Sequence, residues 1–185
     1  MMLTNEVIEV MKRRFTSRKF RNTPVEKEKI EAILDAAKYA PNGGGAQPWH
    51  FTVIQSKEGK DLLLKAAGTN PPPDFPDGPT WPFQADFCGA PVVIMVSVKT
   101  EGVRFPVVSA TLAAENLIIA AASFGLSTLW SSAFSYDMFR DKEACTVKDK
   151  LIPQGNTLVA TIFMGYPEDT PNEKPPRREG VETWL

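Results

Sequence analysis

APNGGGAQPWHF, residues 40–51, places three consecutive glycines between a helix-like segment and a strand-like one. Phosphate-binding loops need either a GxxxxGK[ST] pattern, which is absent, or glycines between a strand and the N-terminus of a helix. Here the partly negative C-terminal end of a helix faces the loop, so we do not expect it to hold an anion. The glycines would instead allow positive φ or a close approach of backbone to something flat. The alternative is a flexible turn, which would not need the stiff continuation Gln47-Pro48-Trp49.

The segment RRFTSRKF, residues 13–20, is where an anion could bind. Arg14, Thr16 and Arg18 alternate, so in an extended chain they share one side. Two guanidinium groups with a hydroxyl between them fit a phosphate monoester. The alternative is that these cations only stabilise the C-terminal end of the preceding helix.

Composition narrows the class of protein. The chain has 185 residues and a net charge of -1, with 43% apolar and 23% charged residues, which indicates one globular domain and no broad nucleic-acid-binding face. Two distant cysteines, Cys88 and Cys145, and the single histidine His50 predict no disulfide framework, no metal site and no Ser-His triad. The N-terminal residues do not form a signal peptide, and no apolar run approaches about 20 residues, so we expect a cytoplasmic protein that does not span a membrane.

Apolar periodicity predicts helices and strands along the whole chain. Helices are expected at 4–14, 24–41, 57–68, 107–125 and 136–145, and strands at 50–55, 91–98, 126–130 and 157–166. The helix at 107–125 is almost wholly apolar or small, which predicts a central, buried position. Six prolines between 71 and 82 predict a long loop or lid. The tail ends in the apolar residues Val181, Trp184 and Leu185, which we expect to dock on another surface. A single sheet layered with helices follows.

The order of these segments resembles the FMN-dependent nitroreductase family of NAD(P)H:flavin oxidoreductases. The family opens with Arg-x-Ser-x-Arg-x-Phe, then Pro-Val, a helix that ends in Ala-Pro, a loop of small residues and Gln-Pro-Trp-x-Phe. The matching residues here are Arg14, Thr16, Arg18, Phe20, Pro24-Val25, Ala40-Pro41, Gln47-Pro48-Trp49 and Phe51. AENLIIAAASFGLSTLW (114–130), ATIFMGYP (160–167) and the tail continue the resemblance over most of the chain.

The resemblance implies an α+β fold, in which a central, mostly antiparallel sheet is flanked by helices. It also implies one FMN-binding domain over residues 1–185, with an extended C-terminal arm at 166–185 that is exchanged in a homodimer. The FMN would lie at the interface between the two subunits.

The resemblance also assigns residues to the FMN. The ribityl phosphate would be held by Arg14, Phe15 through its backbone, Thr16 and Arg18, with Arg177 or Arg178 from the tail. The loop of the other subunit would lie beside the flavin through Pro41, Asn42, Gly43, Gly45 and Gln47; the family loop often reads Ser-x-x-Asn, where this chain has Asn42 and Gly45. Trp130, Ser131, Ser132 and Ala133 would lie against the ring, with the backbone N–H groups of Ser132 and Ala133 as donors to N5 and O4.

The implied activity is transfer of a hydride from NAD(P)H through the flavin to a small-molecule acceptor such as a nitroaromatic, a quinone or free flavin. Because the flavin performs the chemistry, no catalytic side chain is assigned with certainty. Alternatives are a protein that stores or senses FMN without turnover, and a flavin-consuming or dehalogenating relative. A further alternative is an α/β domain in which the glycines and the basic segment are only structural.

Overall fold

The computed structural model describes residues 3–67, 86–131, 148–171 and 173–185. The helices are α1 (Glu6–Arg13), α2 (Lys27–Lys38), α3 (Lys57–Ala67) and α4 (Pro106–Ser123), and the strands are β1 (Trp49–Ile54), β2 (Val92–Lys99), β3 (Ser127–Ser131) and β4 (Asn156–Gly165). Each helix and strand predicted within these ranges is present. The helix predicted at 136–145 and the proline-rich segment 71–82 lie outside the described residues.

The four strands form one sheet in the order β1-β2-β4-β3, and every neighbouring pair is antiparallel. Phe51 pairs with Val96 across β1 and β2, and Ile94 pairs with Ile162 across β2 and β4. The antiparallel sheet expected from the resemblance is therefore confirmed.

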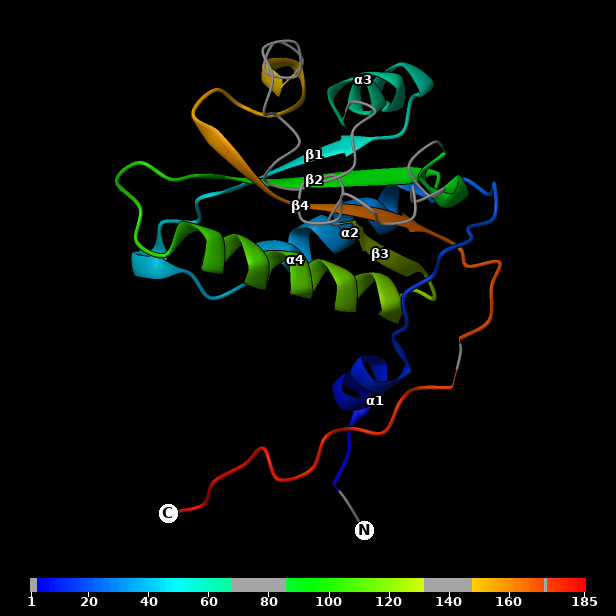
Figure 1. Ribbon diagram of the computed structural model, residues 1–185, viewed down its shortest axis with the longest axis vertical. Helices are drawn as coiled ribbons and strands as arrows, with labels where there is room; N and C mark the ends of the chain where they lie inside the picture. Colours follow the sequence, from blue (N-terminus) through cyan, green and yellow to red (C-terminus); the bar gives the residue numbers. More distant parts are fainter. Residues whose placement is uncertain (1–2, 68–85, 132–147, 172) are drawn as a thin grey trace, which may run out of the picture.

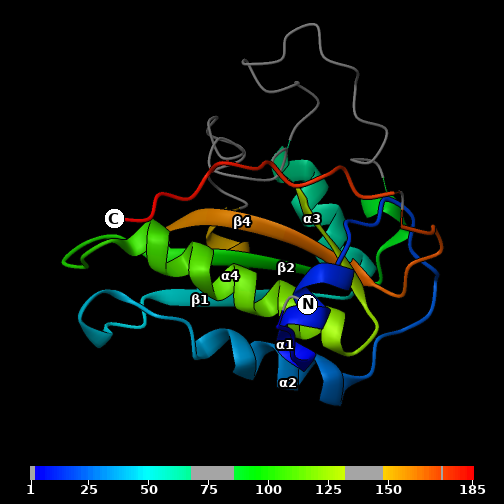
Figure 2. The ribbon, with the colours of Figure 1, turned by 90° about the horizontal axis from the view of Figure 1, so that it is seen from below.

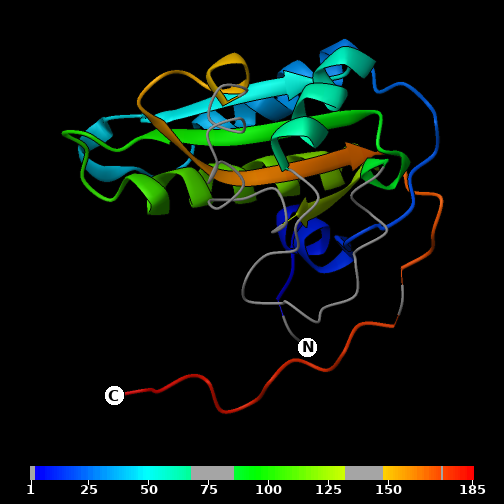
Figure 3. The same ribbon diagram turned by 45° about the horizontal axis from the view of Figure 1, so that its top comes forward.

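Helices cover both faces of this sheet (Figure 1). On one face, α2 and α4 pack on alternate β2 side chains such as Ile94 and Val96. On the other, α3 packs through Leu63 near Val93 and Met95 (Figure 3). Because β2 and β4 are central, both faces of each are buried, which explains their unbroken apolar sequences.

Helix α4, predicted to be central and buried, is buried on one side only. Ala110, Ala114 and Leu117 are fully buried, whereas Val108 is 57% and Leu112 40% exposed. Among the described residues, α4 is also the one helix whose length and composition would allow it to cross a membrane. Its small side chains pack on the sheet and on α2, which is the arrangement of a core helix.

Helix α1 lies outside α4, and the C-terminal tail runs past it, away from the sheet (Figures 1 and 3). Asn5 caps α1 by accepting a hydrogen bond from the N–H of Ile8. Val10 is the buried apolar residue of α1, while Met11 is 52% exposed. Trp184 is 92% exposed, so no described part of its own chain covers it.

Candidate functional site

The basic segment between α1 and α2 runs alongside β3 at Thr16 and bends at Arg18. Thr16 forms a parallel bridge with Thr128 of β3, and the N–H of Ser17 donates to the Thr128 carbonyl at 3.3 Å. Ser17 is completely buried, whereas Thr16 and Arg18 are exposed and Arg14 is half-buried. Thr16 and Arg18 therefore face outward on either side of the buried Ser17.

Side chains from distant elements hold the backbone of this segment. The Ser127 hydroxyl donates to the Phe15 carbonyl at 2.8 Å. The Asp169 carboxylate accepts hydrogen bonds from the Ser17 hydroxyl and, at 2.9 Å, from the N–H of Arg18. Sequence patterns missed these partners, because no local spacing links Asp169 to a residue 152 positions earlier.

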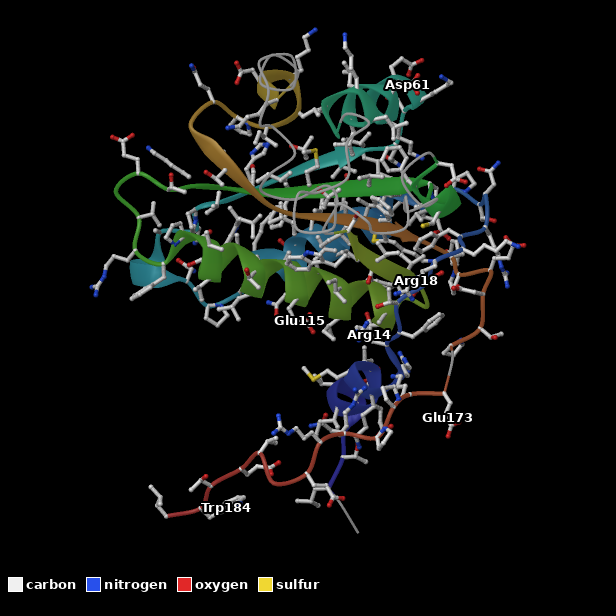
Figure 4. The ribbon with its side chains drawn as sticks, in the orientation of Figure 1. Arg14, Arg18, Asp61, Glu115, Glu173 and Trp184 are labelled. Carbon is white, nitrogen blue, oxygen red and sulfur yellow. The ribbon has the colours of Figure 1, made fainter. Side chains whose placement is uncertain are left out.

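The C-terminal tail adds positive charge beside Arg14. The Lys174 ammonium donates to the Arg14 carbonyl at 2.7 Å and to the Lys12 carbonyl, which closes the C-terminal end of α1. Burial, followed by the charges of Arg14 and Arg177, lowers the pKa of Lys174. Lys174 thus lies beside Arg14 near the C-terminal end of α4, where Figure 4 shows Arg14 and Arg18.

The glycine-rich loop forms a 3-10 turn, Gly43–Gly45, held by Asn42. The Asn42 side chain accepts a hydrogen bond from the N–H of Gln47 at 2.9 Å. Gly44 and Gly45 have φ values of 66° and 69°, and a Cβ at either position would meet nothing within 4 Å. Both glycines therefore supply positive φ, and both present bare backbone to open space.

Gly43 has a different role within the chain. A Cβ at this position would overlap the carbonyl group of Arg104. The Gly43 N–H also donates to the Ser109 hydroxyl at 3.4 Å, and that hydroxyl donates to the Phe105 carbonyl at 2.9 Å. The loop is thus seated on the N-terminal end of α4, and the close approach at Gly43 is to its own chain.

The loop and the basic segment lie at opposite ends of α4, as Figures 1 and 2 both show. Helix α4 has 18 residues, so at 1.5 Å per residue it separates them by about 27 Å. One chain therefore does not bring the two predicted parts of the site together.

The predicted ring-binding residues begin at the end of β3. Trp130 follows Thr128 by two residues, which places it about 7 Å along the strand from the bridge to Thr16. Trp130 is partly exposed and Ser131 is buried. Ser132 and Ala133 lie outside the described residues. The start of the predicted ring-binding stretch and the basic segment thus lie at the same edge of the sheet.

Two groups that could carry chemistry take no part in this arrangement. His50 is exposed on β1, at the far edge of the sheet from β3. Burial raises the pKa of the Cys88 thiol to about 11, which keeps it protonated and unreactive near neutral pH.

Comparisons with known proteins agree on the family and the fold of this chain. A sequence model of the Nitroreductase family matches residues 11–166. A protein of Methanothermobacter thermautotrophicus, named as an NADH dehydrogenase/NAD(P)H nitroreductase, is 28% identical over 185 residues, covering 97% of this chain and 88% of its own length. The FMN-bound nitroreductase of Bacteroides fragilis has a TM-score of 0.85 at 24% identity, over 98% of this chain and all of that one. The FMN-bound nitroreductase of Desulfitobacterium hafniense has a TM-score of 0.82 at 20% identity, over 99% of this chain and all of that one.

The family match covers most of the chain, and the solved neighbours share its fold over their whole length. The resemblance inferred from the order of the motifs, and with it the prediction of a nitroreductase-like enzyme, is confirmed. The chain belongs to the Nitroreductase family.

Proposed function

We propose that the chain is an FMN-dependent oxidoreductase that passes a hydride from NAD(P)H to a small-molecule acceptor such as a nitroaromatic, a quinone or free flavin. We further propose that it works as a homodimer in the cytoplasm. One observation carries the proposal: the glycine-rich loop and the basic segment, which we assign to the flavin ring and the FMN phosphate, lie at opposite ends of α4. The FMN bound to the B. fragilis and D. hafniense neighbours and the name of the archaeal relative support it.

The residues of the basic segment fit the FMN phosphate. Arg14, Arg18 and Arg177 supply fixed positive charge, and the exposed Thr16 supplies a hydroxyl between two of them. Burial, and then the charges of Arg14 and Arg177, lower the pKa of Lys174, and an anion bound beside these cations would offset their repulsion. Because the charge of Arg177 acts on Lys174, we assign Arg177 rather than Arg178 to the phosphate.

The glycine-rich loop fits the flat flavin ring rather than the phosphate. The backbone of Gly45 faces open space without a side chain, so an aromatic ring could approach it closely. The Asn42 side chain accepts a hydrogen bond from the N–H of Gln47 within the loop, and so stabilises the conformation of the loop.

A two-fold dimer would join the two parts. If α4 packs antiparallel on its copy, the N-terminal end of one helix lies beside the C-terminal end of the other. The loop of one subunit then reaches the basic segment of its partner. Such packing would bury the exposed side of α4 around Val108 and Leu112, and would give the tail residue Trp184 a surface on which to dock.

When bound, FMN supplies the hydride-transfer chemistry, and the protein binds, orients and tunes it. Arg14, Thr16, Arg18, Arg177 and the backbone of Phe15 would hold the phosphate and ribityl chain. The partner's Pro41, Asn42, Gly43, Gly45 and Gln47 would line one side of the ring, with Trp130 and Ser131 against it. The backbone N–H groups of Ser132 and Ala133 would donate hydrogen bonds at N5 and O4, where fixed donors stabilise negative charge.

The absorption spectrum of the purified protein tests this function. We expect a yellow protein, or a colourless one that takes up FMN, that bleaches with NADH or NADPH without oxygen and recovers when a nitroaromatic or quinone is added. A protein that takes up no flavin contradicts the proposal. A flavin-loaded protein that neither NADH nor NADPH bleaches would be a storage or sensing protein instead.

A further inference from the structure

We infer that Asp169 is a positioning residue for the FMN phosphate, acting through Ser17 on the segment that carries Arg14, Thr16 and Arg18. The inference rests on the proposed function. It gives the first residues of the C-terminal arm a role within their own subunit, separate from any role in dimerisation.

Asp169 binds Ser17, the buried residue between the exposed Thr16 and Arg18. The Ser17 hydroxyl donates to one carboxylate oxygen of Asp169, and the N–H of Arg18 donates to the other at 2.9 Å. Ser17 is 0% exposed, so these bonds are shielded from competing water on the serine side. The N–H of Lys19 also donates to the Ser17 hydroxyl at 3.3 Å, which continues the same network.

These bonds fix the direction of the neighbouring side chains. Ser17 is buried, whereas Thr16 and Arg18 on either side of it are exposed. Holding Ser17 inward and the Arg18 N–H on the carboxylate therefore keeps Thr16 and Arg18 pointing outward, where the phosphate would bind. Without Asp169, the Arg18 N–H loses its partner and the segment gains freedom that phosphate binding must then remove.

Because Asp169 is negatively charged, a positioning role and a purely electrostatic role predict opposite effects of its removal on FMN binding. A carboxylate beside a phosphate site repels the phosphate, so a role through charge alone predicts that its removal strengthens FMN binding. A positioning role predicts the opposite sign. The adjacent Glu168 is the matched control, because its side chain forms only an exposed ion pair with Lys19 at 3.1 Å.

The test compares FMN with riboflavin, which lacks the phosphate, in titrations of apo-protein. We expect Asp169→Ala to weaken FMN binding by about tenfold, the scale of losing a charge-assisted hydrogen bond, and riboflavin binding by less than about twofold. Ser17→Ala should likewise weaken the binding of FMN more than the binding of riboflavin. Asp169→Asn, which keeps one acceptor oxygen, should recover part of the loss, and Glu168→Ala should leave FMN binding unchanged or slightly stronger.

Three outcomes would overturn the inference: FMN binding that strengthens in Asp169→Ala, equal losses for FMN and riboflavin, or no selective loss in Ser17→Ala. If Asp169→Ala is insoluble, Ser17→Ala decides, because it removes a single hydroxyl. Arg14→Ala separates this failure from that of the proposed function. If Arg14→Ala leaves the ratio of FMN to riboflavin affinity unchanged, the phosphate site itself is wrong; if that ratio falls in Arg14→Ala alone, only the role of Asp169 fails.

Discussion

The substitutions Gly44→Ala and Gly45→Ala distinguish a glycine needed for its backbone conformation from one needed for contact with the flavin. The two positions are nearly equivalent within the chain. Their φ values are 66° and 69°, and a Cβ at either would meet nothing within 4 Å. Only Gly45 is assigned to the flavin, so Gly44 serves as its internal control.

The expected cost to folding follows from this equivalence. An alanine at positive φ destabilises the folded state by about 1 kcal/mol relative to glycine. For a chain of 185 residues that corresponds to a fall in melting temperature of about 2–4 °C, and it should be the same for both variants. A methyl group at Gly45 would also push against the ring, so we expect FMN affinity to fall by about tenfold or more, or about 1.4 kcal/mol, in Gly45→Ala alone.

Thermal melting of the apo-proteins and FMN titration of the same samples measure the two effects separately. Equal melting temperatures with a selective loss of FMN affinity in Gly45→Ala support the proposed contact. Equal FMN affinities in both variants and the unmodified chain would refute it, and the glycines would then serve only the turn.

Three further predictions concern the phosphate, the tail and acid stability. Arg14→Ala should weaken FMN binding by about 1.5–3 kcal/mol and riboflavin binding far less, as measured by titration of apo-protein. Removal of the residues after Glu179 should give monomers or aggregates in sedimentation; a stable, flavin-loaded dimer would contradict the role of the tail. Hydrogen bonds from its own backbone N–H, Tyr166 and Lys29 lower the pKa of Glu26 from 4.5 to about 2, so its contribution to stability is complete above pH 4.5 and is lost as the pH falls toward 2. Glu26→Gln should therefore flatten the acid-unfolding profile between pH 4.5 and 2. An unchanged slope in this range would contradict the stabilising role of the hydrogen bonds to Glu26.

The helices and strands were predictable because each has a local apolar pattern that matches its burial. The unbroken apolar run of β2 is typical of a strand covered on both faces, which is its place in the sheet. Ile30, Ile33 and Ala37 recur at helical spacing, and they form the buried side of α2.

Other features depend on contacts between distant residues and left no local pattern. The burial of α4 was overestimated because an apolar side chain such as Val108 looks the same whether it faces the core or an exposed surface. The bond of Asp169 to Ser17 and the approach of Arg104 to Gly43 join segments brought together only by folding. The shared outward direction of Thr16 and Arg18 was predictable from their alternation in the sequence. The groups that hold the basic segment in place were not predictable.

The central claim is that each FMN site is built from two chains, the loop of one and the basic segment of the other. Co-expression of an Arg14→Ala chain and a Gly45→Val chain, carrying different affinity tags, tests it directly. In the mixed dimer, one site would combine both intact segments and the other site would combine both defects. At an FMN concentration that loads neither parental homodimer, we therefore predict one bound FMN per mixed dimer. A mixed dimer that binds no more FMN than its parents would contradict the claim, because both segments would then have to serve the same site within one chain.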